Sequence, residues 1–228
     1  MEKLELTTTA DGSQTLFVPG LNEHYHSING ALQESELVFI QNGLLHLPQC
    51  LKEINLLEVG FGTGLNALLT TLEAKKQRRK INYVAIEPYP VDSELTENLN
   101  YPEVIGGTEA AGYFKKLHES GWVYPAFLSD YFIISKIQAR LEEIALQDAQ
   151  FHLIYFDAFG PEVQPEMWTE SVFEQLFKCL KPDGILVTYS CKGTVKRALK
   201  AAGFSIEKLP GPAGKREVLR AMKVMDNG

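Results

Sequence analysis

The stretch Glu58-Val59-Gly60-Phe61-Gly62-Thr63-Gly64 decides the fold that the sequence predicts. Its three glycines, at every second position, follow the apolar run Ile54 to Val59, which we predict to be a buried strand. The apolar stripe of Leu65 to Ala74, typical of a helix, comes directly after them. Glycines between a strand and a helix let the backbone turn tightly and approach a ligand, which then faces the first amides of the helix. The stretch therefore predicts a ligand-binding loop in an α/β fold.

The glycine loop by itself leaves two cofactors open. Gly62 to Ala67 fits the G-x-G-x-x-A pattern of dinucleotide sites, so an NAD(P)-dependent oxidoreductase is one interpretation. Glu58 favours S-adenosyl-L-methionine, because methyltransferases of class I place an acid at this strand end, near the methionine part of the cofactor. A carboxylate has no special use beside a pyrophosphate. Glu87, which ends the next predicted strand, is the expected ribose-binding acid in either case.

Strands and helices alternate along the rest of the chain. This alternation predicts an α/β fold with a mostly parallel, doubly wound sheet covered by helices on both faces, the Rossmann-like architecture of class I methyltransferases. The region 101–130 shows no clear pattern. We expect strands over 54–59, 81–86, 133–138, 152–156 and 185–189, a closing antiparallel pair over 205–209 and 215–224, a turn over 181–184, and helices over 65–74, 91–99, 168–180 (capped by Thr169), 194–202 and from the third strand through 146.

The first fifty residues differ from this alternating pattern. Two short β-rich runs, Leu4 to Thr8 and Thr15 to Val18, flank the hairpin turn dipeptide Asp11-Gly12. A helix is expected over 30–40. We therefore expect residues 1–50 to form a small β-rich N-terminal extension that packs on a methyltransferase domain of residues 51–228.

Composition limits the classes of protein. The net charge of −7 argues against a non-specific coat on nucleic acid, although Lys and Arg gather in the last third of the chain. The three cysteines lie far apart and without zinc-type spacing, so we expect neither a metal site nor a disulfide framework. No apolar run is long enough to span a membrane, and the N-terminus lacks the apolar centre of a signal peptide. We therefore expect a cytoplasmic protein that binds no membrane.

Asp157-Ala158-Phe159-Gly160-Pro161 follows the fourth predicted strand. In a doubly wound sheet that strand lies beside the first, so its tip faces the same crevice as the glycine loop. An acid, an aromatic ring and a proline there suggest a wall for the substrate. Asp157 is able to orient an amine and take up its proton, although an Asp at a strand end also caps turns. Met167 and Trp168 are more often core residues than ligand contacts, and Tyr25 and His26 are equally ambiguous.

Motifs along nearly the whole chain form one further pattern: Asn22 to Ser27, Gly30-Ala31, Glu34-Ser35, Glu58 to Asn66, Asp157 to Pro161, Pro165 to Thr169, Thr188 to Ser190, Val195 to Arg197, Ala202 to Phe204 and Gly214 to Glu217. With these motifs the chain resembles a known family of methyltransferases, which forms 5-methylaminomethyl-2-thiouridine at the wobble position of tRNA. In many bacteria this methyltransferase is fused to a flavin-dependent oxidase. No oxidase part is present here, so the resemblance implies a stand-alone form, with the flavin oxidase activity in a separate protein.

The resemblance implies methyl transfer from S-adenosyl-L-methionine to the primary amine of 5-aminomethyl-2-thiouridine at tRNA position 34. Asp157 would act on that amine. A methyltransferase of the same fold acting on a small-molecule amine remains the main alternative, which the acidic net charge slightly favours. Class I enzymes often place an acid after the third strand, near the adenine; Ala139 to Glu142 offers none immediately, so the adenine contact is unassigned. The cofactor is expected at Glu58, Gly60, Gly62, Gly64, Asn66 and Glu87, and the substrate at Tyr25, His26, Phe159, Pro161, Met167 and Trp168.

Overall fold

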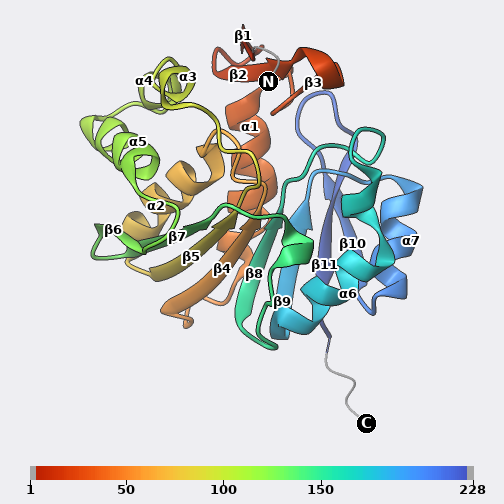
Figure 1. Cartoon of the computed structure of the whole chain (residues 1–228). Coiled ribbons are helices and arrows are strands. Elements are labelled where there is room, and N and C mark those ends of the chain that lie inside the picture. Colours follow the sequence, from red (N-terminus) through yellow and green to blue (C-terminus); the bar gives the residue numbers. More distant parts are fainter. Residues whose placement is uncertain (1–3, 225–228) are drawn as a thin grey trace.

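A computed structural model describes residues 4–224 of the chain. Among these residues, a central sheet of eight strands has the order β10-β11-β9-β8-β4-β5-β7-β6 (Figure 1). Its strands β4, β5, β7, β8 and β9 are parallel, and the outer pairs are antiparallel, as the sequence predicts for the closing pair. The strands are β4 (Glu53–Val59), β5 (Lys80–Ile86), β6 (Ala126–Ser129), β7 (Phe132–Ile137), β8 (Phe151–Phe156), β9 (Leu180–Thr188), β10 (Ser205–Pro210) and β11 (Glu217–Met222).

Helices cover both faces of the sheet, which confirms the predicted doubly wound α/β fold (Figure 1). The strand β4 shows why: Leu56 and Leu57 are both fully buried, yet they point into two different hydrophobic clusters. Successive side chains of a strand face opposite sides, so a continuous apolar run requires cover on both. The helices are α1 (Ala31–Ser35), continued by a π-helix (Glu36–Gln41), α2 (Leu65–Gln77), α3 (Ser93–Thr96), α4 (Tyr101–Ile105), α5 (Thr108–Glu119), α6 (Glu170–Cys179) and α7 (Gly193–Ala201).

The order of the strands creates the site. From β4 the chain proceeds outward to β5 and β7 and then returns to β8 on the other side of β4. Open α/β sheets bind ligands at such a reversal, beyond the carboxyl ends of the strands. The tips of β4 and β8 are directly hydrogen-bonded, since the Asp157 amide donates to the Val59 carbonyl at 2.9 Å. The predicted meeting of the first and fourth strand ends is therefore confirmed.

The N-terminal residues form a separate antiparallel sheet of β1 (Glu5–Thr8), β2 (Gln14–Val18) and β3 (Glu23–His24), which lies above the carboxyl ends of the parallel strands (Figure 1). The predicted hairpin is present, with its turn at Asp11-Gly12. Leu16 and Phe39 are buried in the same cluster as residues of β4 and α2. The division into residues 1–50 and 51–228 stays our proposal.

Several expected elements differ. The helix expected after the third strand is wrong, because residues 138–150 contain only a 3₁₀ turn at Leu141–Glu143, whose Leu141 packs into the second cluster. The helix expected over 91–99 shortens to α3. The turn at 181–184 lies within β9 as an irregularity at which the pairing with β8 shifts register and Asp183 adopts a φ of 59°. The 3₁₀ turn Pro165–Trp168 precedes α6, whose Thr169 accepts a hydrogen bond from the Val172 amide, as predicted.

Candidate active site

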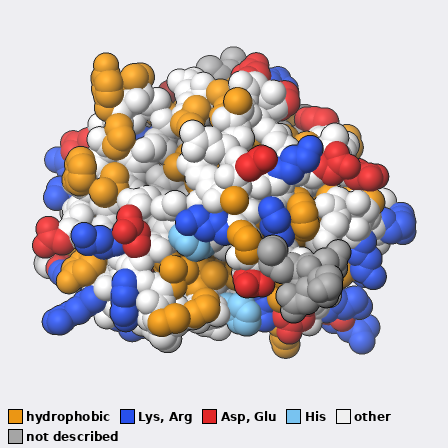
Figure 2. Space-filling model, turned by 90° about the horizontal axis from the view of Figure 1, so that it is seen from below, with side chains coloured by type: hydrophobic (Ala, Val, Ile, Leu, Met, Phe, Trp, Pro, Cys, Tyr) orange, Lys and Arg blue, Asp and Glu red, His pale blue; other side chains and the backbone are white. Residues whose placement is uncertain are grey.

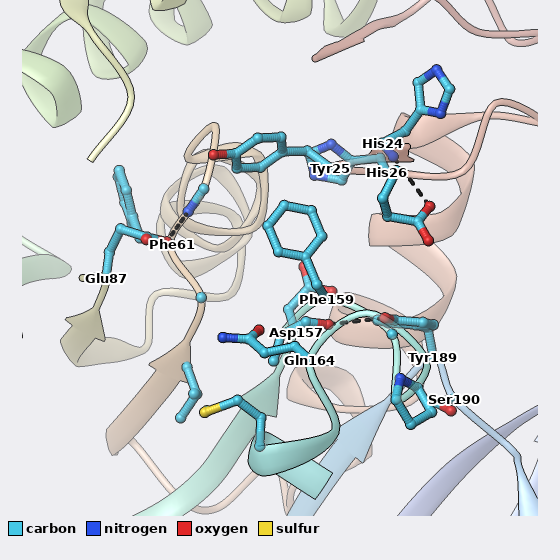
Figure 3. A pocket seen from close by; sticks show the side chains of 18 of the residues that line it. His24, Tyr25, His26, Phe61, Glu87, Asp157, Phe159, Gln164, Tyr189 and Ser190 are labelled. Carbon is cyan, nitrogen blue, oxygen red and sulfur yellow. Dashed lines mark hydrogen bonds between the residues drawn. The ribbon is translucent and has the colours of Figure 1, made fainter. Parts of the chain in front are cut away.

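A pocket of about 470 Å³ lies at the carboxyl ends of β4, β5 and β8, beneath β3 and the segment that follows it. Figure 3 shows its arrangement: Glu87 and Phe61 on one side, Asp157 and Phe159 at the centre, and Tyr189 and Ser190 on the other side. The ring of Tyr25 extends over the top toward the glycine loop, whereas His24 points away from the pocket. The face at the opposite, amino end of the parallel strands mixes acidic, basic and apolar side chains (Figure 2).

The glycine loop forms the floor of the pocket next to β4. Gly60, Gly62 and Gly64 have φ values of 92°, 51° and 77°, a region that side chains other than glycine rarely adopt. A β-carbon on Gly60 would lie 2.5 Å from the Asp157 carbonyl oxygen. Close contact between the loop and the tip of β8 therefore requires glycine at this position. Gly60 and Gly62 line the pocket, while Gly64 lies behind it at the start of α2.

Glu87 binds the loop from the end of β5. Its carboxylate accepts hydrogen bonds from the Gly62 amide at 3.1 Å and the Tyr89 amide at 2.9 Å. Burial raises the pKa of Glu87, and these two amides oppose the rise. Glu87 also lines the pocket. It holds the loop in shape and keeps lone pairs available for ligand hydroxyl groups.

Glu58 lies at the end of β4 but not in the pocket lining. It is fully buried, and neither carboxyl oxygen has a hydrogen-bond partner among the described residues. Burial raises the pKa of Glu58 well above its usual value, with the neighbouring Tyr83 hydroxyl opposing the rise. Native proteins rarely leave buried polar groups unsatisfied. The carboxyl group of Glu58 therefore lies behind the pocket wall, at the start of the glycine loop, with hydrogen-bonding capacity that no described residue uses.

Asp157 joins the glycine loop to the rest of the pocket. Its Oδ2 accepts a hydrogen bond from the Asn66 Nδ2 at 2.8 Å, and Asn66 lies behind the lining in the first turn of α2. Burial raises the pKa of Asp157 to about 7; Glu34 adds to the rise, whereas Asn66 and Lys215 oppose it. Such a carboxylate is able to accept a proton near neutral pH.

Aromatic and apolar side chains form the remaining wall. Tyr25 meets Phe159 edge-on with ring centroids 5.1 Å apart, and Pro161 and Met167 also line the pocket. Trp168 does not: it packs on Phe156 and Phe173 in the core and donates its indole N–H to the Phe159 carbonyl at 2.7 Å. We expected Trp168 to contact the substrate; in the structure it supports Phe159 from behind the pocket wall.

His26 lines the pocket, and its hydrogen bonds tie it to the neighbouring strand β2. Its amide donates to the Thr15 hydroxyl at 3.0 Å, and its ring lies 3.3 Å from the same oxygen. Burial lowers the pKa of His26 to about 4, so the ring is neutral at physiological pH. A neutral imidazole adds shape and hydrogen-bonding capacity to the wall without adding charge.

Several residues that line the pocket have no role predicted from the sequence. Glu34 and Lys215 form an ion pair there, and Tyr189 donates its hydroxyl proton to the Ala158 carbonyl at 2.9 Å. Arg140 to Glu142 border the pocket after β7, at the place left unassigned for the adenine. Glu34, Tyr189 and Lys215 all belong to motifs that carry the family resemblance. That membership is the sequence signal that could have pointed to a role for them in the site.

Residues 4–224 contain no group of three or more His, Cys, Asp or Glu side chains placed to hold a metal ion. Within the same range, none of the helices has the length and apolar character needed to cross a membrane.

Comparison with known proteins shows which proteins the chain is similar to. The family described as S-adenosyl-L-methionine-dependent methyltransferase matches residues 130–224. The tRNA 5-methylaminomethyl-2-thiouridine biosynthesis bifunctional protein MnmC of Magnetococcus marinus is 29% identical over 225 residues, covering 92% of this chain and 32% of that protein. The protein of the same name from Pseudomonas putida strain F1 is 30% identical over 213 residues, covering 86% of this chain and 31% of the relative. The chain thus spans about a third of the length of these relatives.

Solved structures agree on the fold. The crystal structure of MNMC2 from Aquifex aeolicus aligns with a TM-score of 0.78 and 23% identity, over 98% of this chain and 71% of that one. Spermidine synthase from Thermotoga maritima aligns with a TM-score of 0.53 and 15% identity, over 99% and 73%. The glycine loop, the two strand-end acids and these matches agree: the chain has a Rossmann-like fold, its residues 130–224 match a family of S-adenosyl-L-methionine-dependent methyltransferases, and nearly its whole length is similar to part of the MnmC bifunctional proteins.

Proposed function

We propose that the protein methylates the primary amine of 5-aminomethyl-2-thiouridine at tRNA position 34, giving 5-methylaminomethyl-2-thiouridine. The observation that carries the proposal is Asp157, a desolvated carboxylate beside the glycine loop whose pKa is raised to about 7. The names of the relatives, tRNA 5-methylaminomethyl-2-thiouridine biosynthesis proteins, supply the substrate class. A tRNA substrate also supports our expectation of a cytoplasmic location.

The residues around the loop fit S-adenosyl-L-methionine. The carboxyl group of Glu58 and the Oδ1 of Asn66 lie buried behind this wall without a hydrogen-bond partner among the described residues, so the wall has acceptor capacity for the amino group of a methionine-type ligand. Glu87 has acceptor capacity for ribose hydroxyl groups, Gly60 and Gly62 leave the backbone accessible in the pocket, and Gly64 forms the turn into α2 behind them. When bound, this cofactor supplies an electrophilic methyl group.

The protein's own part in the reaction is to prepare the amine. A primary alkylamine is protonated at neutral pH, as lysine is, and has no lone pair to offer in that state. Asp157 would accept one proton from the ammonium group onto a carboxylate oxygen and hold the neutral nitrogen in line for attack. Tyr25 and Phe159, with Pro161 and Met167, would exclude water and hold the base.

A basic region of the chain supports tRNA as the partner. Residues 192–223 contain nine Lys and Arg against two Glu, although the whole chain has a net charge of −7. Lys192, at the start of α7, lines the pocket. Lys196, Arg197 and Lys200 continue along α7 and make no salt bridge within residues 4–224. We propose that this helix contacts the phosphate backbone beside the wobble base.

Nucleoside mass analysis tests the function. Transfer RNA that carries the aminomethyl group is incubated with the protein and S-adenosyl-L-methionine, and its nucleosides are compared with those of untreated tRNA. We expect 5-aminomethyl-2-thiouridine to be converted to the N-methylated nucleoside. Methylation of the free nucleoside at an equal kcat/KM would favour the small-molecule alternative, and no turnover on either substrate, with normal cofactor binding, refutes the proposal.

The tRNA surface needs its own test. The variant Lys196→Gln/Arg197→Gln/Lys200→Gln should weaken tRNA binding and lower the salt slope of log K by up to about 3, because each cation that neutralises a phosphate contributes about 1 to that slope. The matched control is Lys75→Gln/Lys76→Gln/Lys80→Gln, which removes the same charge at the end of α2 and the start of β5. If both variants weaken tRNA binding equally, the effect comes from the net charge of the protein and not from a contact between α7 and tRNA.

A further inference from the structure

An ion pair in the pocket lining has no part in the mechanism above. Glu34 comes from α1, and Lys215 comes from the loop between β10 and β11, 181 residues later. The Glu34 side chain is 7% exposed and that of Lys215 is 28% exposed, so solvent screens this pair less than it screens surface pairs. Ion pairs this well buried are uncommon unless they have further partners.

Both members have such partners at the site. Glu34 accepts a hydrogen bond from the Ser27 amide at 2.9 Å, in the segment that follows Tyr25 and His26. The ammonium group of Lys215 lies 3.9 Å from the centroid of the Tyr189 ring. The Tyr189 hydroxyl binds the carbonyl of Ala158, directly after Asp157. The pair therefore joins the N-terminal extension, the β10–β11 loop and the tip of β8.

The packing around the pair is tight. Gly214, which precedes Lys215, has a φ of 83°, and a β-carbon there would meet the Asn29 side chain at 2.1 Å. The loop also closes on itself, since the Lys215 amide donates to the Pro212 carbonyl at 2.9 Å. The backbone at Lys215 is thus fixed by the loop, while its ammonium group is held by Glu34.

Asp157 experiences these two charges in opposite directions. Glu34 raises the pKa of Asp157, and Lys215 lowers it. The other titratable groups that interact with Asp157 are Glu58, Tyr83, Tyr101 and Tyr189, all with their pKa values raised by burial, so each favours its neutral form. The ion pair therefore supplies the only opposing charges acting on Asp157 among these groups of the described chain.

We propose that Glu34 and Lys215 are a positioning pair for Asp157, whose opposite charges determine whether Asp157 is ionised and ready to take the proton of the substrate ammonium group. The inference rests on the proposed amine methylation. Neither residue touches the reacting atoms. The positive charge of Lys215 keeps the buried Asp157 from staying protonated. The negative charge of Glu34 offsets part of that effect, so that Asp157 remains a strong enough base to take a proton.

Two single variants test the proposal, since they should change the reaction in opposite directions. In a pH profile of kcat/KM, Lys215→Met should move the midpoint of the acidic limb upward and Glu34→Gln should move it downward. A change of about 0.5–1 pH unit, or roughly 3–10-fold in rate on the limb, is expected. The double variant should return toward the wild-type midpoint, and Lys215→Arg, which keeps the charge, should resemble the wild type.

The matched control is Lys208→Met, which breaks the exposed pair with Glu217 in the same hairpin and should leave the midpoint unchanged. A second readout needs neither substrate nor cofactor. Carbon-13 carboxyl NMR of the ligand-free protein, with the Asp157 signal assigned by its disappearance in Asp157→Asn, should show the same opposite changes in titration midpoint. Circular dichroism verifies that each variant is folded, and Lys215→Gln and Glu34→Ala, which also remove the charge, serve if Lys215→Met or Glu34→Gln unfolds.

The outcomes are separable. If the wild type fails to methylate tRNA while the NMR midpoints move in opposite directions, the proposed function is wrong and the positioning pair stands. If both variants move the midpoint in the same direction, or neither moves it, the proposal is overturned whether or not the enzyme is active.

Discussion

The substitution Gly60→Ala examines the contact on which the site depends. Gly60 has a φ of 92°, and its amide donates to the Ile86 carbonyl at 3.0 Å, so the neighbouring strand fixes its backbone. A β-carbon added there would lie 2.5 Å from the Asp157 carbonyl oxygen and 3.0 Å from the Asp157 carbonyl carbon. Neither neighbour is a flexible side chain, so the backbone of the loop or of the β8 tip has to move.

The magnitude combines two costs. A residue other than glycine in the left-handed region costs about 1–2 kcal/mol, and an overpacked contact costs about 1–3 kcal/mol. We expect the free energy of unfolding to fall by about 2–5 kcal/mol. Because the loop and Asp157 are forced apart, the dissociation constant for S-adenosyl-L-methionine should rise by at least about tenfold, equivalent to about 1.4 kcal/mol.

Urea denaturation measures the first quantity and isothermal titration calorimetry the second. The matched control is Gly112→Ala on α5, where φ is not positive and no atom lies within 4 Å of the added β-carbon. That exchange should stabilise the protein by about 0.5–1 kcal/mol, because alanine favours a helix over glycine. A Gly60→Ala protein as stable as the wild type, with cofactor affinity within threefold, would refute the reasoning.

Three further substitutions probe separate parts of the molecule. Asp157→Asn keeps the size and the acceptor for Asn66 but cannot take a proton, so nucleoside mass analysis should show turnover reduced by about 10²-fold or more while calorimetry finds cofactor affinity largely kept. Burial lowers the pKa of Lys136 to about 8, so between pH 8 and 10 the unfolded chain binds more protons than the folded one, and the free energy of unfolding should rise with pH over that range. In urea denaturation at several pH values, Lys136→Met should remove this rise. If the variant shows the same rise as the wild type, the ammonium group of Lys136 lies in water. Trp168→Phe removes the hydrogen bond to the Phe159 carbonyl and should lower the free energy of unfolding by about 1 kcal/mol. In steady-state assays it should raise KM for tRNA more than it lowers kcat. An equal change in KM and kcat would show that Trp168 does more than support Phe159.

The accuracy of the sequence prediction varied with how local the signal was. The strands β4, β5 and β8 were anticipated to within one residue at each end, because a continuous apolar run bounded by glycine or an acid has few other solutions. The helix expected after β7 failed since Leu141 and Ile144 pack on the second hydrophobic cluster, which a 3₁₀ turn and a short extended segment satisfy. The amphipathic helix α5 was missed behind Gly106-Gly107 and the irregular α4.

The candidate site divides in the same way. Gly60, Glu87 and Asp157 were predicted because each stands at the end of a strand, and parallel strands bring such ends to one edge of the sheet. Trp168 was expected against the substrate, but its indole N–H needs a partner when buried and finds one in the Phe159 carbonyl. Glu34 and Lys215 received no role, since no local pattern relates residues so far apart in the chain.

The sequence by itself determined the parallel sheet and the glycine loop, because periodicity and backbone freedom are properties of neighbouring residues. It favoured S-adenosyl-L-methionine over a dinucleotide only through Glu58 and the family resemblance. Only the tertiary structure decided which side chains face the pocket and what charge surrounds Asp157. That charge comes from Glu34 on α1 and Lys215 on the β10–β11 loop, which meet where the segment before α1 lies against that loop. Electrostatic interactions depend on distance and burial, and neither is written in the order of the residues.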